Sequence, residues 1–193
     1  VWDMLRKIDM IKLFPAAARS LIGDFSGVMQ FLVEIEMSMY KGLPVRGVFL
    51  QNIVFDLIMG LDEVRYLERF SRFVEDRLGA IPGFITMNHP AAVEIVCDRL
   101  GLEKPWLCAN FNAGGFRMNP SFEAVEASFA SGRTHNIAMS VFASGAADPT
   151  TALDHVLAAK GVDSLLFGSS RRENILANTN RIVEGTNGFA TNG

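Results

Sequence analysis

Residues 137–167 read IAMSVFASGAADPTTALDHVLAAKGVDSLLF, and they carry the clearest signal for the class of the fold. Two short apolar runs, Ile137–Phe142 and Ser164–Phe167, flank a helix-length segment at Asp148–Lys160. An Asp-Pro pair opens this segment and a Lys-Gly pair closes it, which suits the two ends of a helix. A strand, a helix and a second strand in this order predict two parallel strands, because parallel pairing needs a long crossover connection.

The same alternation runs through the rest of the chain. Each apolar run is short, is too apolar for a half-exposed strand, and is typical of a strand that is covered on both faces. The other expected strands are Val48–Leu50, Gly83–Met87 and Trp106–Phe111, with Leu13–Ala17 as a possible sixth. The other expected helices are 25–40, 62–78, 90–100, 120–131 and 171–183.

Repeated strand–helix units predict an α/β fold with a parallel sheet, either doubly wound or closed into a barrel. No GxGxxG or Walker sequence is present, whereas single polar residues follow several strands, which favours a parallel (β/α)8 barrel of the TIM type. Eight units do not fit in 193 residues at this spacing. We therefore expect an incomplete barrel of about six strand–helix units, with the first units lacking. It would form a single domain over residues 1–183, followed by a flexible tail at 184–193.

Composition and charge indicate the cellular compartment and exclude some classes of partner. Hydrophobic residues make up 49% of the chain and the net charge is −3, which excludes a disordered chain and gives no basic surface for nucleic acid. The longest apolar stretch, Val48–Leu61, contains polar residues and is too short to span a bilayer. The charged start, Val1–Ile11, is unlike a signal peptide, and the two cysteines suit free thiols. We expect a cytoplasmic protein with no membrane partner and no nucleic-acid partner.

Two motifs near the carboxyl end are similar to those of the aldo-keto reductases. Residues 136–145, NIAMSVFASG, resemble the family's seventh strand, which often reads IAYSPLASG. Residues 167–178, FGSSRRENILAN, resemble its final phosphate loop and helix, GASRPEQLEEN. Farther back the resemblance is one of topology, with Val45–Asp56 at the place of the family's fourth strand. The resemblance implies an oxidoreductase on a (β/α)8 barrel that binds NADP(H) across its carboxyl-terminal rim.

The resemblance also implies cofactor-binding roles for single residues. It places Ser140 and Gly145 at the pyrophosphate, Asn88 at the nicotinamide carboxamide, and Ser169, Arg171 and Asn178 at the adenosine-side phosphate and the adenine. Independently of the resemblance, the segment 168–170 opens a helix, where unpaired N–H groups and the helix dipole favour an anion. Arg171 adds a charged donor there. The alternative is that the serines only cap the helix.

The reacting end of the site departs from the family pattern. The family's catalytic histidine falls on Gln51 or Asn52, its strand-six glutamine on Cys108 and its stacking tyrosine on Met139. We therefore expect a rebuilt or degenerate active site whose catalytic residues are unknown, with Asn52, Gln51 and His89 as candidates. A histidine at this place suits acid–base chemistry near neutral pH, although a packing role at the start of the next helix is the preferred interpretation.

Two other functions stay open. Asn110, Asn112 and Arg117 follow a strand and would hold the substrate of a non-redox lyase or isomerase that acts on a phosphorylated or carboxylated small molecule. The chain would otherwise be a non-catalytic barrel protein in an assembly. The helix expected at 25–40 carries an apolar stripe, which would suit a homo-oligomer if barrel units are lacking. No histidine or cysteine spacing predicts a metal site. The expected partner is a small-molecule substrate or a phosphorylated ligand.

Overall fold

The strands of the sheet follow one another in the order of the chain, β1-β2-β3-β4-β5. The computed structural model describes residues 25–190, and their side chains as far as Gly185. The pairings β2–β3, β3–β4 and β4–β5 are parallel. The strands are β1 (Gly47–Leu50), β2 (Ile81–Thr86), β3 (Trp106–Asn110), β4 (His135–Met139) and β5 (Ser164–Leu165).

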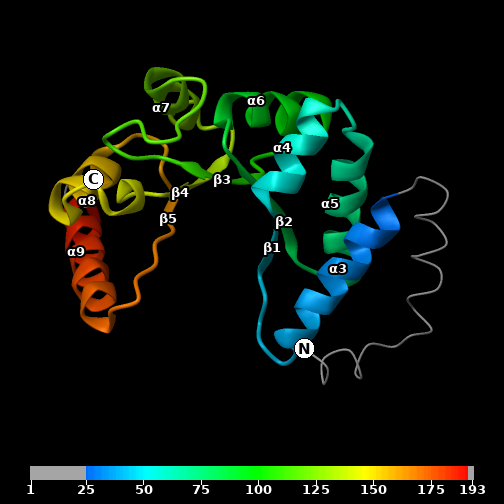
Figure 1. Ribbon diagram of the computed structural model, residues 1–193, viewed down its shortest axis with the longest axis horizontal. Helices are drawn as coiled ribbons and strands as arrows, with labels where there is room; N and C mark the ends of the chain where they lie inside the picture. Colours follow the sequence, from blue (N-terminus) through cyan, green and yellow to red (C-terminus); the bar gives the residue numbers. More distant parts are fainter. Residues whose placement is uncertain (1–24, 191–193) are drawn as a thin grey trace. The chain divides into compact units, whose positions relative to one another are not determined.

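Helices connect each strand to the next, as the alternation in the sequence predicts (Figure 1). The α-helices of the described residues are α3 (Ser26–Met39), α4 (Asn52–Gly60), α5 (Arg65–Leu78), α6 (His89–Val93), α7 (Phe122–Ala130), α8 (Pro149–Ala158) and α9 (Arg172–Ala190). A π-helical turn, η1 (Glu94–Arg99), continues α6, and a 3-10 turn, η2 (Ala143–Gly145), follows β4.

The strand order separates the two architectures that the sequence leaves open. A doubly wound sheet reverses its strand order at a switch point, whereas a barrel keeps the order of the chain. The described sheet contains no such reversal. The expected α/β class with a parallel sheet is confirmed, and the order is consistent with part of an α/β barrel. Closure into the full eight-stranded form stays a prediction, and the possible strand at Leu13–Ala17 lies outside the described residues.

Helix α4 corrects one expectation. The resemblance predicts a strand over Val45–Asp56, but the structure has a strand only over Gly47–Leu50, and α4 begins two residues later. The α4 segment reads NIVFDLIMG and is apolar on nearly every side, so it shows no helical stripe that periodicity can detect. At the other end of the chain, α9 continues to Ala190, so the expected tail at 184–193 is helical over most of its length.

Side-chain caps fix the starts of three helices. Asn88 Oδ1 accepts the Ala91 N–H of α6 at 3.3 Å, and Ser121 Oγ accepts the Ala124 N–H of α7 at 3.2 Å. Asp148 Oδ1 accepts the Thr151 N–H of α8 at 3.0 Å. Each bond satisfies a backbone donor that the first helical turn leaves without an intrahelical partner.

The chain divides into two compact units, and the first contains residues 25–48 and 63–82 among those described. Helices α3 and α5 lie side by side in it (Figure 1). Arg69 Nη1 donates to Ser26 Oγ at 2.9 Å, and the Phe25 and Tyr66 rings meet edge to face at 6.5 Å. On α3, Leu32 and Met39 are 56% and 57% exposed, yet whether this apolar stripe supports a homo-oligomer stays a prediction.

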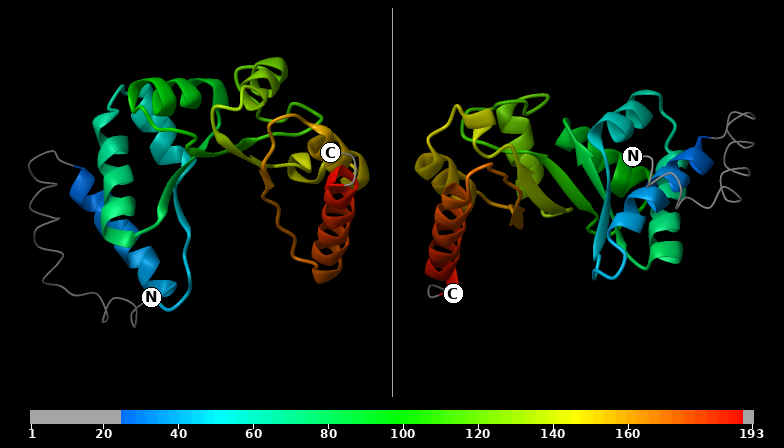
Figure 2. Two further views of the ribbon diagram at one scale, coloured as in Figure 1. Left: turned by 180° about the vertical axis from the view of Figure 1, so that it is seen from behind. Right: turned by 60° about the horizontal axis from the view of Figure 1, so that its bottom comes forward.

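The second unit contains residues 49–62 and 83–190 among those described and holds the larger core. Phe111, Phe129 and Leu153 are fully buried there, between the sheet and the helices α7 and α8. Helices α8 and α9 lie side by side in both views of Figure 2. No helix in the described part of the chain is both long enough and apolar enough to cross a membrane.

Candidate functional site

A groove of about 1160 Å³ opens beside the carboxyl ends of β4 and β5. Its walls come from the turn that joins β4 to α8, from the loop that joins β5 to α9, and from one face of α9. Polar strand ends of a parallel sheet gather at one rim, which is where ligands of α/β folds bind. The groove lies entirely within the second unit.

The turn after β4 has an unusual backbone. Ser140, Ala143 and Ser144 have φ angles of 54°, 47° and 59°, a left-handed region that L-residues with a side chain rarely adopt. Two short hydrogen bonds hold the turn, from Ala143 N–H to Ser140 O and from Gly145 N–H to Phe142 O, both at 2.8 Å. Such strained positions cluster at ligand sites. Here they place Ser140, Ser144 and Gly145 on the groove wall.

The loop after β5 supplies a second part of the groove wall. Ser169 lines the groove, and its Oγ accepts the Arg171 N–H at 3.1 Å as the chain turns into α9. This bond uses a lone pair of the hydroxyl and leaves its proton available to a ligand. This bond shapes the turn one residue before α9, and the serine still offers a donor to the groove.

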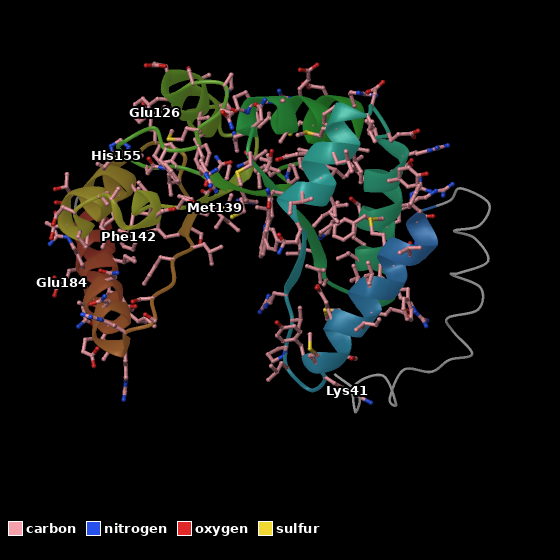
Figure 3. All side chains as sticks on the ribbon, viewed as in Figure 1. Lys41, Glu126, Met139, Phe142, His155 and Glu184 are labelled. Atoms are coloured by element: carbon pink, nitrogen blue, oxygen red, sulfur yellow. The ribbon has the colours of Figure 1, made fainter. Side chains whose placement is uncertain are left out.

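One face of α9 completes the groove with Asn174, Asn178, Arg181 and Glu184, which follow one another at helical spacing. Figure 3 labels Glu184 on α9 and Met139 and Phe142 at the end of β4. Arg181 Nη2 donates to both carboxylate oxygens of Asp154 at 2.8 Å, whereas its Nε is buried and has no hydrogen-bond partner among the described residues. The charged residues that line the groove are therefore Arg181, which is already paired with Asp154, and Glu184.

Four of the six residues expected to bind the cofactor line this one groove. They are Ser140, Gly145, Ser169 and Asn178. Arg171 is exposed and lies next to the groove in sequence but outside its lining. Asn88 lies at the end of β2, where its side chain caps α6, so the structure does not bring it to the groove.

His89 is held inside the protein. It is 1% exposed, its Nε2 lies 2.8 Å from Asn136 Oδ1 and its Nδ1 lies 2.9 Å from Ser128 Oγ. Burial lowers the pKa of the ring from 6.5 to about 4, against a smaller opposing effect of the bond to Asn136. These contacts agree with the packing role that the sequence favours for His89 over acid–base chemistry.

Gln51 and Asn52 stand where β1 passes into α4, and both stay candidates. Gln51 is exposed at the start of the helix, and Asn52 is its first residue and half-buried. Asp56, one turn farther along α4, accepts from Thr86 Oγ–H at 2.7 Å and from Met87 N–H at 3.0 Å. Its carboxylate therefore ties α4 to the carboxyl end of β2.

Asn110 and Asn112 build the loop after β3. Asn110 Nδ2 donates to Arg117 O at 3.0 Å, and Asn112 both donates to Phe116 O at 3.0 Å and accepts the Phe116 N–H at 2.8 Å. Both amides are at most 3% exposed, whereas Arg117 is exposed and its guanidinium lies 5.1 Å from the Phe116 ring centre. The Asn112 amide has its bonds within the loop, while Asn110 Nδ2 also donates to Met87 Sδ at 2.9 Å, and a role of the three residues in binding substrate stays a prediction.

The two cysteines are free thiols. Cys108, at the place of the family's strand-six glutamine, is 2% exposed, and burial raises the pKa of its thiol to about 12. A thiol with so high a pKa is not a nucleophile near neutral pH. His155 lies on α8 with its Nε2 3.9 Å from Glu126 Oε1 of α7 (Figure 3), and His135 is the exposed first residue of β4.

Sequence reasoning missed part of the groove wall. The aromatic pair Phe142 and Phe167 lines it, with ring centres 6.0 Å apart and planes at 78°. No local pattern joins these two rings, but the spacing of Asn174, Asn178, Arg181 and Glu184 is a helical stripe of polar residues that the sequence does display. In the described part of the chain no group of three or more His, Cys, Asp or Glu side chains is placed to hold a metal ion. No protein-family model, no curated protein and no solved structure matches this chain.

Proposed function

We propose that the groove binds a nicotinamide dinucleotide of the NADP(H) type, and that the protein is an aldo-keto-reductase-like oxidoreductase with a rebuilt reacting end. One observation carries the proposal. Two separate motifs, one after β4 and one after β5, contribute Ser140, Gly145, Ser169 and Asn178 to a single groove. The resemblance selects these residues by motif alone, and their meeting in one groove supports the proposal.

The phosphate end of the groove fits such a ligand. Its lining contains the hydroxyls of Ser140 and Ser169 and also Gly145, at which the backbone can approach a ligand closely. The loop that carries Ser169 leads into the first turn of α9, where backbone donors and the dipole favour an anion. Ser140, Gly145 and Ser169 would hold the phosphates, with Arg171 beside them, and Asn178 would hold the adenosine end.

The groove is also large enough. Its volume of about 1160 Å³ exceeds the several hundred Å³ of an ordinary small-molecule pocket, as an extended dinucleotide requires. The cofactor would supply hydride transfer when bound. The structure offers a methionine, Met139, on the groove wall where the family has a stacking tyrosine, and this supports a reacting end that differs from the family's.

Titration calorimetry with NADPH and NADH tests the proposal. We expect micromolar binding of NADPH, weakened about tenfold by Arg171→Ala and by Ser169→Ala, because each change removes a hydrogen bond to phosphate. The matched controls are Arg72→Ala and Ser131→Ala, which alter exposed residues outside the groove and should leave the affinity unchanged. Absence of heat with both nucleotides at millimolar concentration would overturn the proposal.

A further inference from the structure

Two aromatic rings form a corner in the wall of the groove. Phe142 comes from the turn after β4 and Phe167 from the loop after β5. Their ring centres are 6.0 Å apart and their planes stand at 78°, which is a T-shaped contact. Both side chains are half-buried and both line the groove. We call this pair the aromatic corner.

The two rings differ in what else they contact. Phe142 packs against the core formed by Phe111, Phe129 and their neighbours, which anchors its ring. Phe167 meets Phe142 and stands in the short loop that leads to α9. One ring is thus fixed by the fold, and the other is held nearly perpendicular to it at the edge of the groove.

Perpendicular rings suit a third planar ring. A planar group that stacks on one ring of the corner presents its edge to the other, and both arrangements are favourable for aromatic pairs. Stacking of a base on an aromatic side chain accepts any base, since each base has a π-face. The corner therefore matches a flat heteroaromatic group better than a sugar or a phosphate, which have no such face.

We infer that the aromatic corner of Phe142 and Phe167 is the stacking site for the purine base of the bound nucleotide. The inference rests on the proposed function, because it assigns a part of that ligand to a part of the same groove. The other lining residues, among them Ser140, Ser144 and the α9 face, are left for the sugar and phosphate groups. Phe142 and Phe167 then bind the base and take no part in the chemistry.

The experiment compares two ligands that differ only in the base. AMP and ribose 5-phosphate each compete against NADPH, whose bound fraction is followed by its fluorescence. In the unaltered protein we expect AMP to displace NADPH at a concentration at least tenfold below that of ribose 5-phosphate. In Phe167→Leu the concentrations at which the two competitors displace NADPH should agree within about threefold. Leucine keeps the apolar volume and loses the stacking face.

Three further variants separate stacking from packing. Phe167→Tyr keeps the ring face and should retain the preference for AMP. Phe142→Leu should lose it, while Phe122→Leu, which alters a ring that packs on the same core but lies outside the groove, should retain it. Thermal melting of each variant shows whether it is folded, and Phe167→Leu carries the test if Phe142→Leu does not fold.

The outcomes distinguish the two proposals. NADPH binding with equal displacement by AMP and ribose 5-phosphate in the unaltered protein would overturn the aromatic corner and leave the proposed function standing. An unchanged preference for AMP in folded Phe167→Leu and Phe142→Leu would overturn it too. Absence of NADPH binding would overturn the proposed function, and the base assignment with it.

Discussion

His89 Nε2 lies 2.8 Å from Asn136 Oδ1, although the two residues are 47 positions apart in the chain. Asn136 Nδ2 donates to Phe129 O at 3.1 Å and to Gly161 O at 2.8 Å, so Oδ1 is the accepting end of its amide. His89 therefore carries its proton on Nε2 and accepts the Ser128 hydroxyl proton on Nδ1. The neutral ring satisfies both of its nitrogens, and the pair ties the start of α6 to β4.

The first prediction concerns the pH dependence of stability. Burial lowers the folded-state pKa of His89 to about 4, below the unfolded value of 6.5, so the unfolded chain binds more protons between these values. This contribution to stability is complete above pH 6.5 and is lost as the pH falls toward 4, by up to about 3 kcal/mol. Urea unfolding at pH 7.5, 6.0, 5.0 and 4.5 measures it.

The control for this prediction is a histidine that water reaches. His135→Gln alters an exposed residue and should leave the pH profile as it is, whereas folded His89→Gln should flatten it between pH 6.5 and 4. Identical profiles for the two variants would show that His89 does not carry this part of the pH dependence.

Asn136 is the second test of the same network. It is fully buried and accepts from His89 and from Thr134 Oγ–H, the latter at 2.5 Å. Asn136→Ala removes the partner of these two donors and of the Gly161 carbonyl, and should lower the free energy of unfolding by about 3–5 kcal/mol. Asn174→Ala, on an exposed position of α9, should cost less than about 0.5 kcal/mol. A similar small loss for both variants in urea unfolding would contradict the network.

The fold was predictable where its signal is local. Residues 137–167 contain the whole pattern of strand, helix and strand, and each end of the helix carries its own marker residues. The turn residues Ser140 and Gly145 and the loop residue Ser169 are equally local, since each lies within six residues of the end of a strand. Parallel strands in chain order then bring such strand ends to one rim, which is why a reading of motifs alone could name four residues of the groove.

Much of the rest of the fold and of the candidate site depends on contacts between residues that are far apart in the sequence. Helix α4 is apolar on most sides, so periodicity gives no reason to separate it from the strand before it. The partners of His89 and the perpendicular rings of Phe142 and Phe167 come from segments far apart in sequence. Asn110 and Asn112 carry side chains that suit a ligand, and only their bonds to nearby backbone groups reveal that they shape a loop.

The third prediction concerns Asp56. Its two carboxylate oxygens accept from Thr86 Oγ–H and from Met87 N–H, which joins α4 to the end of β2. Asp56→Ala leaves both donors without this partner and should destabilise the protein by about 1–3 kcal/mol. Asp76→Ala, which removes an exposed carboxylate from α5, should have an effect below about 0.5 kcal/mol. Urea unfolding at pH 7 measures the loss of stability in both variants. Equal losses would contradict the role of Asp56 in joining α4 to β2.

The last prediction compares two glycines with the same backbone requirement and different surroundings. Gly161 and Gly101 have φ angles of +80° and +67°, so alanine at either position costs about 1–2 kcal/mol of backbone strain. A Cβ on Gly161 would also lie 2.0 Å from Phe129 O, whereas nothing lies within 4 Å of one on Gly101. Backbone atoms cannot move aside as a flexible side chain can, and the Gly161 carbonyl also accepts from Asn136.

We therefore expect Gly161→Ala to lower the free energy of unfolding by more than about 3 kcal/mol and Gly101→Ala by only the strain shared by both, about 1–2 kcal/mol. Urea unfolding of the two variants beside the unaltered protein measures the difference. Gly101→Asn provides a further check, because asparagine tolerates the left-handed region and should recover part of the loss. Equal losses for Gly161→Ala and Gly101→Ala would contradict the prediction. They would show that the backbone at Gly161 can move away from Phe129 O and make room for the added Cβ.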